Sequence, residues 1–170
     1  RRRSRRAGQN KNNPLEKGVG FPCGFSINNC AAHWTPIHPN DNSIIKKNDV
    51  CKIDFGVHIN GYIIDSAWTI AFNDKYDNLI KASKDATNTG LKLAGPDVLI
   101  SEISKNIEEV ISSYEIELNN KNYKIKPVRN LCGHQIEKYK RHSKKAIPII
   151  NISNYNARMK EGEFYAIETF

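Results

Sequence analysis

Residues 52–68 read KIDFGVHINGYIIDSAW, and this stretch decides how the surrounding chain folds. Two runs of branched and aromatic residues meet at Asn60-Gly61. That dipeptide is a strong hairpin signal, because a type I′ turn needs positive φ at both central residues. The pattern therefore predicts two antiparallel strands, over residues 50–59 and 62–71, joined by a two-residue loop.

Each predicted strand carries an aspartate inside its apolar pattern. A two-residue loop places Gly56 opposite Asp65 and Asp54 opposite Ala67, so both carboxylates lie on one sheet face as diagonal neighbours. Their Cα atoms would be roughly 7–8 Å apart. Two carboxylates at this separation repel each other unless a divalent cation lies between them. From this stretch alone, a metal site and a polar, solvent-facing sheet side are equally good interpretations.

The rest of the chain predicts an α+β protein with strands and helices in separate runs. Gly95-Pro96-Asp97 separates two helical patterns and offers Asp97 as an N-cap candidate. The predicted elements are a flexible basic lead-in over 1–20, an extended stretch over 21–36, helices over 75–93 and 98–114, a hairpin over 114–128, and strands over 146–152 and 163–170. Since the chain stops inside the last strand, we expect a fragment of a longer protein.

Composition restricts the class of protein. The 170 residues are 39% hydrophobic and 26% charged, as in one soluble globular domain. The apolar runs are a few residues long, whereas a transmembrane helix needs roughly 18, so no membrane partner is expected. The four cysteines, scattered and without a CxxC pair, predict reduced thiols and a cytoplasmic location.

The net charge of +8 is concentrated at the N-terminus. The first six residues, RRRSRR, hold five arginines, which leaves 8 − 5 = +3 for the rest of the chain. A body of +3 argues against a nucleic-acid-binding domain, and no DNA partner is expected. A second basic cluster is a solvated face or a surface for RNA phosphates; its members are Lys138, Lys140, Arg141, Lys144 and Lys145.

Other residues of metal-ligand type lie elsewhere in the sequence. His134 follows Gly133 in NLCGHQI, and Glu168 is a carboxylate within the apolar stretch YAIETF. Together with two aspartates they form a plausible ligand set for a divalent transition metal. His33 and His142 are further candidates, although a single histidine is more often an ordinary polar residue.

Five segments, in this order, resemble the methionine aminopeptidase type 2 family: FPCGFSINNCAAHWTP, KIDFGVHINGYIIDSAWT, KDATNTG, VRNLCGHQI and EGEFYAIETF. The resemblance covers about residues 21–170. It implies a pita-bread fold, a mostly antiparallel sheet with flanking helices, whose C-terminal half is incomplete here. It also implies a catalytic domain over 21–170 that removes the initiator methionine from nascent polypeptide N-termini.

The resemblance further implies a role for each candidate residue. Two divalent metal ions, of Mn, Co, Fe or Zn, would be held by Asp54 on one ion, Asp65 bridging both, and His134 and Glu168 on the second. His33 would lie beside the scissile amide, and His142 would contact the substrate amide or carbonyl. Phe21 and Asn130 match positions close to the methionine pocket.

The sequence departs from the family pattern in places. The family's fifth ligand, a glutamate, would come after Phe170, so activity of these 170 residues alone is not expected. Glu137 and Arg141 stand where the family usually has glycine and an apolar residue. Arg141 would lie near the methionine pocket, which predicts an altered substrate or inhibitor preference. The arginine run over 1–6 is an extension that could contact the ribosome.

Two other functions remain open on sequence grounds. One is a non-catalytic relative of the same fold, of the proliferation-associated type, that binds RNA and ribosomes. Such proteins lose metal ligands, notably at the position of Asp65, which is present here. The other is a proline-specific relative such as prolidase, against which NNCAAHWTP argues.

Overall fold

The hairpin predicted around Asn60-Gly61 is present in the computed structural model, which describes residues 13, 15–36, 41 and 43–170. β2 runs over Val50–Ile59 and β3 over Tyr62–Ala71, as expected. Asn60 and Gly61 have φ of 50° and 85°, the positive values that a type I′ turn requires. This local turn signal fixes the strand pairing.

The chain divides into two units. Unit 1 comprises residues 1–72 and 136–141, and unit 2 comprises residues 73–135 and 142–170. Each unit is described by itself.

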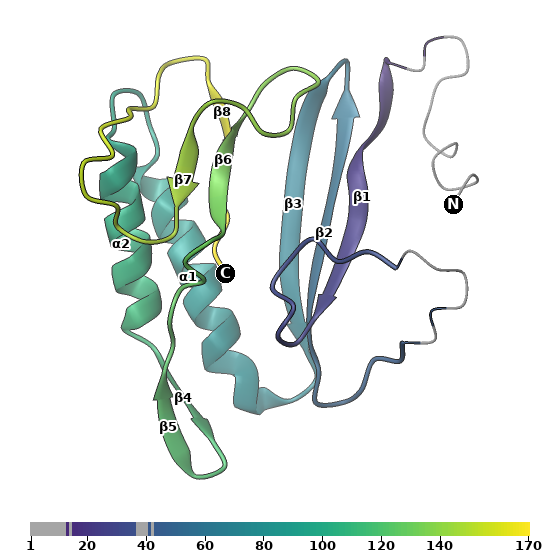
Figure 1. The fold of residues 1–170 in the computed structure, drawn as a ribbon, viewed down its shortest axis with the longest axis vertical. Coiled ribbons are helices and arrows are strands. Elements are labelled where there is room, and N and C mark those ends of the chain that lie inside the picture. The colour runs from purple at the N-terminus through teal and green to yellow at the C-terminus, as the bar shows by residue number, and fades with distance from the viewer. Residues whose placement is uncertain (1–12, 14, 37–40, 42) are drawn as a thin grey trace. The chain divides into compact units, whose positions relative to one another are not determined.

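Unit 1 contains a three-stranded antiparallel sheet in the order β1-β2-β3 (Figure 1). β1 spans Lys17–Ile27, so the strand begins inside the stretch expected to be a flexible lead-in. Of the rest of that lead-in, residues 1–12 and 14 lie outside the described residues. The pairing of β1 with β2 shifts on both sides of Phe21. Such irregularities in an edge strand tolerate Pro22, which explains why the sequence resembled a loop.

Unit 2 contains two helices joined by a short connection. α1 spans Asp77–Leu93, after the 3-10 turn η2 over Asp74–Tyr76, and α2 spans Ile100–Ser112. Both predicted helices are confirmed with slightly later starts. The expectation that Asp97 caps α2 is wrong, because the N-cap is Leu99. Asp97 has φ of 64°, and its N–H donates to the Met159 carbonyl at 2.9 Å.

The strands of unit 2 are short. The predicted hairpin forms from β4, Glu115–Leu118, and β5, Lys121–Lys124, with two left-handed asparagines between them. A second sheet has the order β7-β6-β8. Its strands are β6 over Cys132–Ile136, whose last residue belongs to unit 1, β7 over Ala146–Pro148, and β8 over Phe164–Ala166. β6 was not predicted, and β7 and β8 are shorter than expected.

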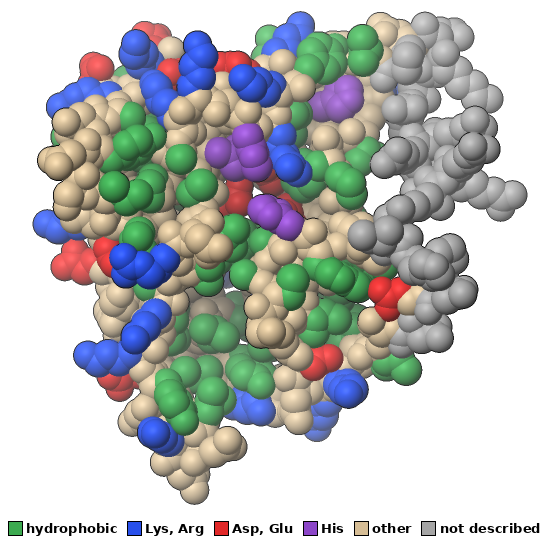
Figure 2. Space-filling model, viewed as in Figure 1, with side chains coloured by type: hydrophobic (Ala, Val, Ile, Leu, Met, Phe, Trp, Pro, Cys, Tyr) green, Lys and Arg blue, Asp and Glu red, His purple; other side chains and the backbone are tan. Residues whose placement is uncertain are grey.

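Unit 2 has its own hydrophobic core. The isoleucines of α2 recur every three or four residues and are almost fully buried, and they pack with α1 and β7. Burial of one such side chain contributes about 1.5–3 kcal/mol. The core includes Ala82, Ala86, Ile100, Ile103, Ile107, Ile111, Ile147, Ile149 and Met159. Hydrophobic side chains also remain visible over the β4–β5 hairpin in Figure 2, where Tyr123 is 45% exposed.

Among the described residues, no helix is both long and apolar enough to cross a membrane.

Candidate metal and substrate site

Asp54 and Asp65 lie on neighbouring strands and on the same face of the unit 1 sheet. Asp54 pairs with Ala67 and Asp65 with Gly56, which is the predicted register. Both aspartates are half-buried. The repulsion of two partly desolvated carboxylates on one face is relieved most directly by a hard divalent cation. The sheet therefore presents a carboxylate pair suited to cation binding.

Phe21 stands in the same cross-strand row as Asp65. Phe21 of β1 pairs with Gly56 of β2, which pairs with Asp65 of β3. Since adjacent strands are about 4.8 Å apart, the two outer residues are about 10 Å apart at Cα. A Cβ on Gly56 would lie 2.2 Å from the Phe21 ring. The ring can pack against β2 at this position only because Gly56 has no side chain. Phe21 is only 8% exposed.

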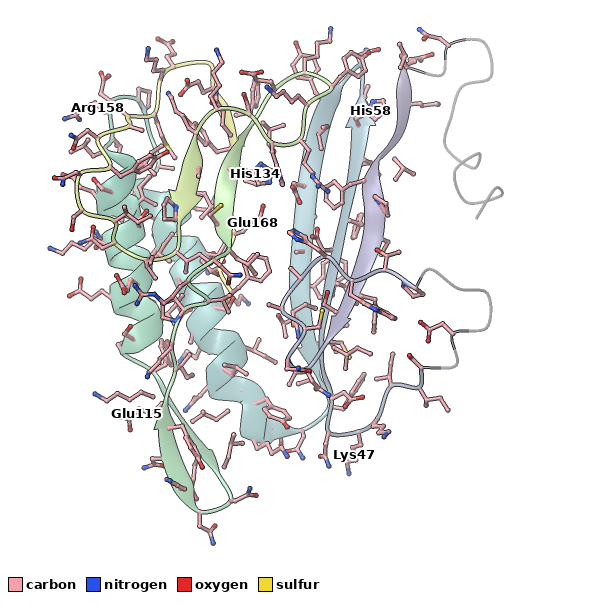
Figure 3. All side chains as sticks on the ribbon, in the orientation of Figure 1. Lys47, His58, Glu115, His134, Arg158 and Glu168 are labelled. Carbon is pink, nitrogen blue, oxygen red and sulfur yellow. The ribbon has the colours of Figure 1, made fainter. Side chains whose placement is uncertain are left out.

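Unit 2 holds a second pair of candidate ligands. His134 lies in β6, and Glu168 follows two residues after the end of β8. The Nε2 atom of His134 is 2.8 Å from Oε1 of Glu168, and both side chains are largely buried (Figure 3). An imidazole nitrogen beside a carboxylate is a donor pair typical of transition-metal sites. Metal binding would require the imidazole to be neutral and the carboxyl group to be ionised.

The backbone approaches closely at this pair. A Cβ on Gly133 would lie 2.4 Å from the Ala166 carbonyl oxygen and 3.1 Å from the Glu168 nitrogen. Only glycine leaves enough space for the C-terminal segment to pass beside β6 at this distance. Gly133 therefore sets the separation of His134 and Glu168.

His142 lies beside the same pair. Its ring centroid is 4.1 Å from that of His134, with the rings tilted by 58°. The connection from β6 to β7 is held by two hydrogen bonds, from Ser143 N–H to the Gln135 carbonyl and from Gln135 N–H to the Lys145 carbonyl. His142 is exposed, so its ring is accessible to a ligand.

His33 and Asn130 lie in exposed loops. His33 belongs to unit 1 and adopts φ of 67°, a left-handed conformation that is uncommon outside glycine. Its loop is tied to β1, because Phe25 N–H donates to the Trp34 carbonyl and Trp34 N–H to the Ser26 hydroxyl. Asn130 belongs to unit 2 and precedes β6.

Sequence reasoning missed a partly buried ion pair that precedes β8. Both carboxylate oxygens of Glu163 accept from Lys145 Nζ, at 2.6 and 2.7 Å. Burial alone would raise the pKa of Glu163, but hydrogen bonds from Lys145, the Tyr165 hydroxyl and the Lys160 N–H outweigh it and lower the pKa to about 2. No spacing in the sequence signals this pair, because its members are 18 positions apart and share no repeating pattern.

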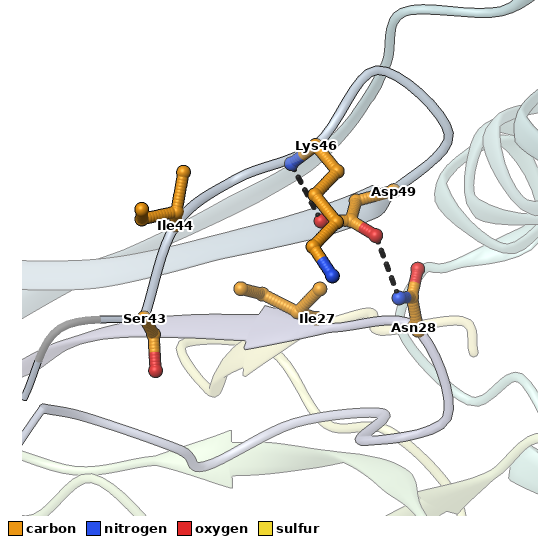
Figure 4. A pocket seen from close by; sticks show the side chains of 6 residues that line it. All are labelled: Ile27, Asn28, Ser43, Ile44, Lys46 and Asp49. Atoms are coloured by element: carbon orange, nitrogen blue, oxygen red, sulfur yellow. Dashed lines mark hydrogen bonds between the residues drawn. The ribbon is translucent and has the colours of Figure 1, made fainter.

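An open cavity of about 450 Å³, lined by both polar and apolar side chains, lies elsewhere in unit 1 (Figure 4). Asp49 anchors it by accepting from Asn28 Nδ2 and from the Lys46 N–H. These hydrogen bonds, led by that of Asn28, lower the pKa of Asp49. No predicted site residue lines the cavity; its lining is Ile27, Asn28, Ser43, Ile44, Lys46 and Asp49.

The chain resembles proteins of known kind. The sequence signature described as metallopeptidase family M24 matches residues 2–170. The chain is 53% identical over 156 residues to methionine aminopeptidase 2 of Komagataella phaffii, covering 92% of this chain and 34% of that protein. It is 52% identical over 163 residues to methionine aminopeptidase 2 of Kluyveromyces lactis, covering 96% of this chain and 38% of that protein. The chain thus spans little more than a third of the length of these curated relatives.

The fold also has relatives among solved structures. The crystal structure of methionine aminopeptidase from Rickettsia prowazekii matches with a TM-score of 0.71 at 22% identity. The match covers 86% of this chain and 55% of that chain. The predicted α+β, pita-bread fold and the resemblance stated from the sequence are confirmed.

Proposed function

Because the chain belongs to metallopeptidase family M24, we propose that it is part of a methionine aminopeptidase that removes the initiator methionine from nascent proteins. The observation that carries the proposal is the presence of all four expected ligands in a chain 53% identical to methionine aminopeptidase 2. Nascent chain N-termini are the proposed substrates, which favours a cytoplasmic enzyme.

The proposed metal ligands come as two pairs. Asp54 would bind one ion, Asp65 would bridge two, and His134 and Glu168 would bind the second. The shared sheet face of the aspartates and the 2.8 Å separation of His134 and Glu168 support this assignment. Mn, Co, Fe and Zn all suit a set of carboxylates with one imidazole. When bound, such ions lower the pKa of a water molecule and polarise the substrate carbonyl group.

The remaining candidates would handle the peptide. The exposed His142 ring beside His134 supports a role in donating a hydrogen bond to the substrate carbonyl, which gains negative charge during hydrolysis. His33 would lie beside the scissile amide. Phe21 would contact the methionine side chain, and its row with Asp65 supports this, because the pocket wall then adjoins the metal ligands. Asn130 is proposed to line the same pocket.

The test is methionine release by the full-length protein from Met-Ala-Ser in the presence of Mn²⁺ or Co²⁺. We expect Asp65→Asn to reduce kcat/KM by at least about a hundredfold, because a neutral amide cannot replace a bridging carboxylate. The matched control is Asp74→Asn, the same change on an exposed carboxylate of η2. Bound metal, measured by elemental analysis, should fall only in Asp65→Asn.

Two outcomes would contradict the proposal. If the folded wild-type protein releases no methionine, a non-catalytic relative of the fold becomes the better explanation. If Asp65→Asn retains activity and metal, the ligand assignment is wrong.

A further inference from the structure

The segment after β8 is attached to α1 through alternate residues. Ile167 packs at Gly90, where an added Cβ would lie 2.8 Å from the Ile167 side chain. Thr169 is hydrogen-bonded to Ser83, and its hydroxyl oxygen is 2.6 Å from that of Thr87. Ser83, Thr87 and Gly90 are spaced as i, i+4 and i+7, so they form one face of the helix. That face therefore receives the side chains of residues 167 and 169.

Glu168 stands between these two residues and faces the other way. Its Oε1 atom is 2.8 Å from Nε2 of His134 in β6. Side chains that alternate in direction are typical of an extended backbone. Fixing Ile167 and Thr169 on α1 therefore directs the carboxylate of Glu168 toward His134.

Three hydroxyl groups hold Thr169 on α1. The Ser83 hydroxyl donates to the Thr169 carbonyl at 3.0 Å, and the Thr169 hydroxyl donates to the Ser83 carbonyl at 2.8 Å. The Thr87 hydroxyl lies 3.1 Å from the Ser83 carbonyl oxygen and 2.6 Å from the Thr169 hydroxyl oxygen. Each hydroxyl group carries one proton, and donation from Thr87 to Thr169 uses the third. We refer to Ser83, Thr87 and Thr169 as the hydroxyl clamp.

On these grounds we infer that the hydroxyl clamp positions Glu168 for metal binding. The inference rests on the proposed function, in which Glu168 binds a divalent ion. Thr169 follows Glu168 directly in the chain, so a shift of Thr169 along α1 moves the carboxylate. Loss of groups that orient a metal ligand typically lowers metal affinity by roughly tenfold to a hundredfold. The clamp members are positioning residues, because they act on the ion only through Glu168.

The test is a calorimetric titration of the metal-free, full-length protein with Mn²⁺. Wild type is compared with Thr169→Val, Thr169→Ser, Ser83→Ala and Ser104→Ala. Valine removes the Thr169 hydroxyl and keeps the branched shape, whereas serine keeps the hydroxyl. Ser104→Ala is the matched control for Ser83→Ala, because Ser104 is a buried residue of α2 whose hydroxyl donates to the Ile100 carbonyl at 3.0 Å. Urea unfolding measures the stability of each variant.

We expect Thr169→Val and Ser83→Ala each to weaken Mn²⁺ binding by about tenfold. Thr169→Ser should stay within about threefold of wild type, because its hydroxyl can make the same hydrogen bonds. Ser104→Ala should lose stability and keep its affinity for Mn²⁺. The visible absorption spectrum of the Co²⁺-loaded protein, which depends on ligand geometry, should change in Thr169→Val and not in Ser104→Ala.

Wild-type Mn²⁺ affinity in both Thr169→Val and Ser83→Ala would overturn the inference. An equal loss of affinity in Ser104→Ala would overturn it too, because the clamp would then act only through the stability of the fold. Methionine release is measured separately. A wild type that binds Mn²⁺ and releases no methionine contradicts the proposed function, and the affinities of the variants still decide on the clamp. A wild type that binds no Mn²⁺ contradicts both.

Discussion

At the scale of single residues, Glu163 illustrates how a carboxylate becomes a structural anchor. It accepts hydrogen bonds from the Lys145 side chain, which precedes β7, and from the Tyr165 hydroxyl and the Lys160 N–H near β8. Lys145 also donates to the Arg158 carbonyl. The anchor therefore ties the loop before β8 to the start of β7, and β8 leads directly to Glu168.

This anchor predicts a pH dependence of stability. The pKa of Glu163 is lowered from about 4.5 to about 2 on folding, so its contribution is present above pH 4.5 and is lost as the pH falls to 2. We expect Glu163→Gln to lower the free energy of unfolding above pH 4.5 and to approach wild type near pH 2. Urea unfolding at several pH values measures this.

The control for Glu163→Gln is Glu161→Gln, the same change on an exposed carboxylate two residues away. Its stability should follow the wild-type pH profile. A Glu163→Gln profile parallel to wild type between pH 4.5 and 2 would contradict the assignment.

Residue-level predictions from sequence succeeded where the partners are local. Asp54 and Asp65 were placed on one face because eleven positions and one turn separate them. The contact of Arg141 with Phe21 could not be found in this way, since neither residue carries a pattern that points to the other. The cap prediction for Asp97 failed because Leu99 is the N-cap of α2, and the N–H of Asp97 instead makes a tertiary hydrogen bond to the Met159 carbonyl.

At the scale of elements, the strands that sequence missed are those whose pairing is not local. β1 pairs with β2 across more than twenty intervening residues, and it contains Pro22. β6 is five residues long and depends on β7 and β8 for its hydrogen bonds. A propensity pattern in so short a segment is weak, and the tertiary partners decide it.

The approach of β6 to β8 predicts the effect of one methyl group. We expect Gly133→Ala to destabilise the protein by about 1–3 kcal/mol, because its Cβ would lie 2.4 Å from the Ala166 carbonyl oxygen. The displaced C-terminal segment should also separate Glu168 from His134. Metal affinity is then expected to fall together with stability, as measured by titration calorimetry and urea unfolding.

Gly95→Ala is the matched control for Gly133→Ala. A Cβ there would lie 3.9 Å from its nearest neighbour, Val98, which is ordinary contact. The control should keep both stability and metal affinity. A stable Gly133→Ala protein with unchanged metal affinity would show that the backbone approach does not set the ligand separation.

At the scale of the whole molecule, each unit holds one pair of the proposed metal ligands. Asp54 and Asp65 come from unit 1, and His134 and Glu168 from unit 2. The two pairs are far apart in sequence. The hairpin contains only the aspartate pair, and its sequence alone therefore could not distinguish a metal site from a polar sheet surface. Family membership resolves the class of protein, and Asp65→Asn tests the assignment of ligands.

Charge distribution over the whole chain gives the last prediction. Five of the net eight positive charges lie within residues 1–6, which are outside the described residues. If this run binds ribosomal RNA phosphates, deleting it should reduce co-sedimentation with ribosomes at about 50 mM salt and flatten the salt dependence of binding, because fewer counterions are released. Lys138→Gln with Lys140→Gln is the control, since it removes two charges from the second basic cluster. An unchanged ribosome pellet after the deletion, at low salt, would rule out this contact, and a loss in the control alone would assign the binding to the second cluster.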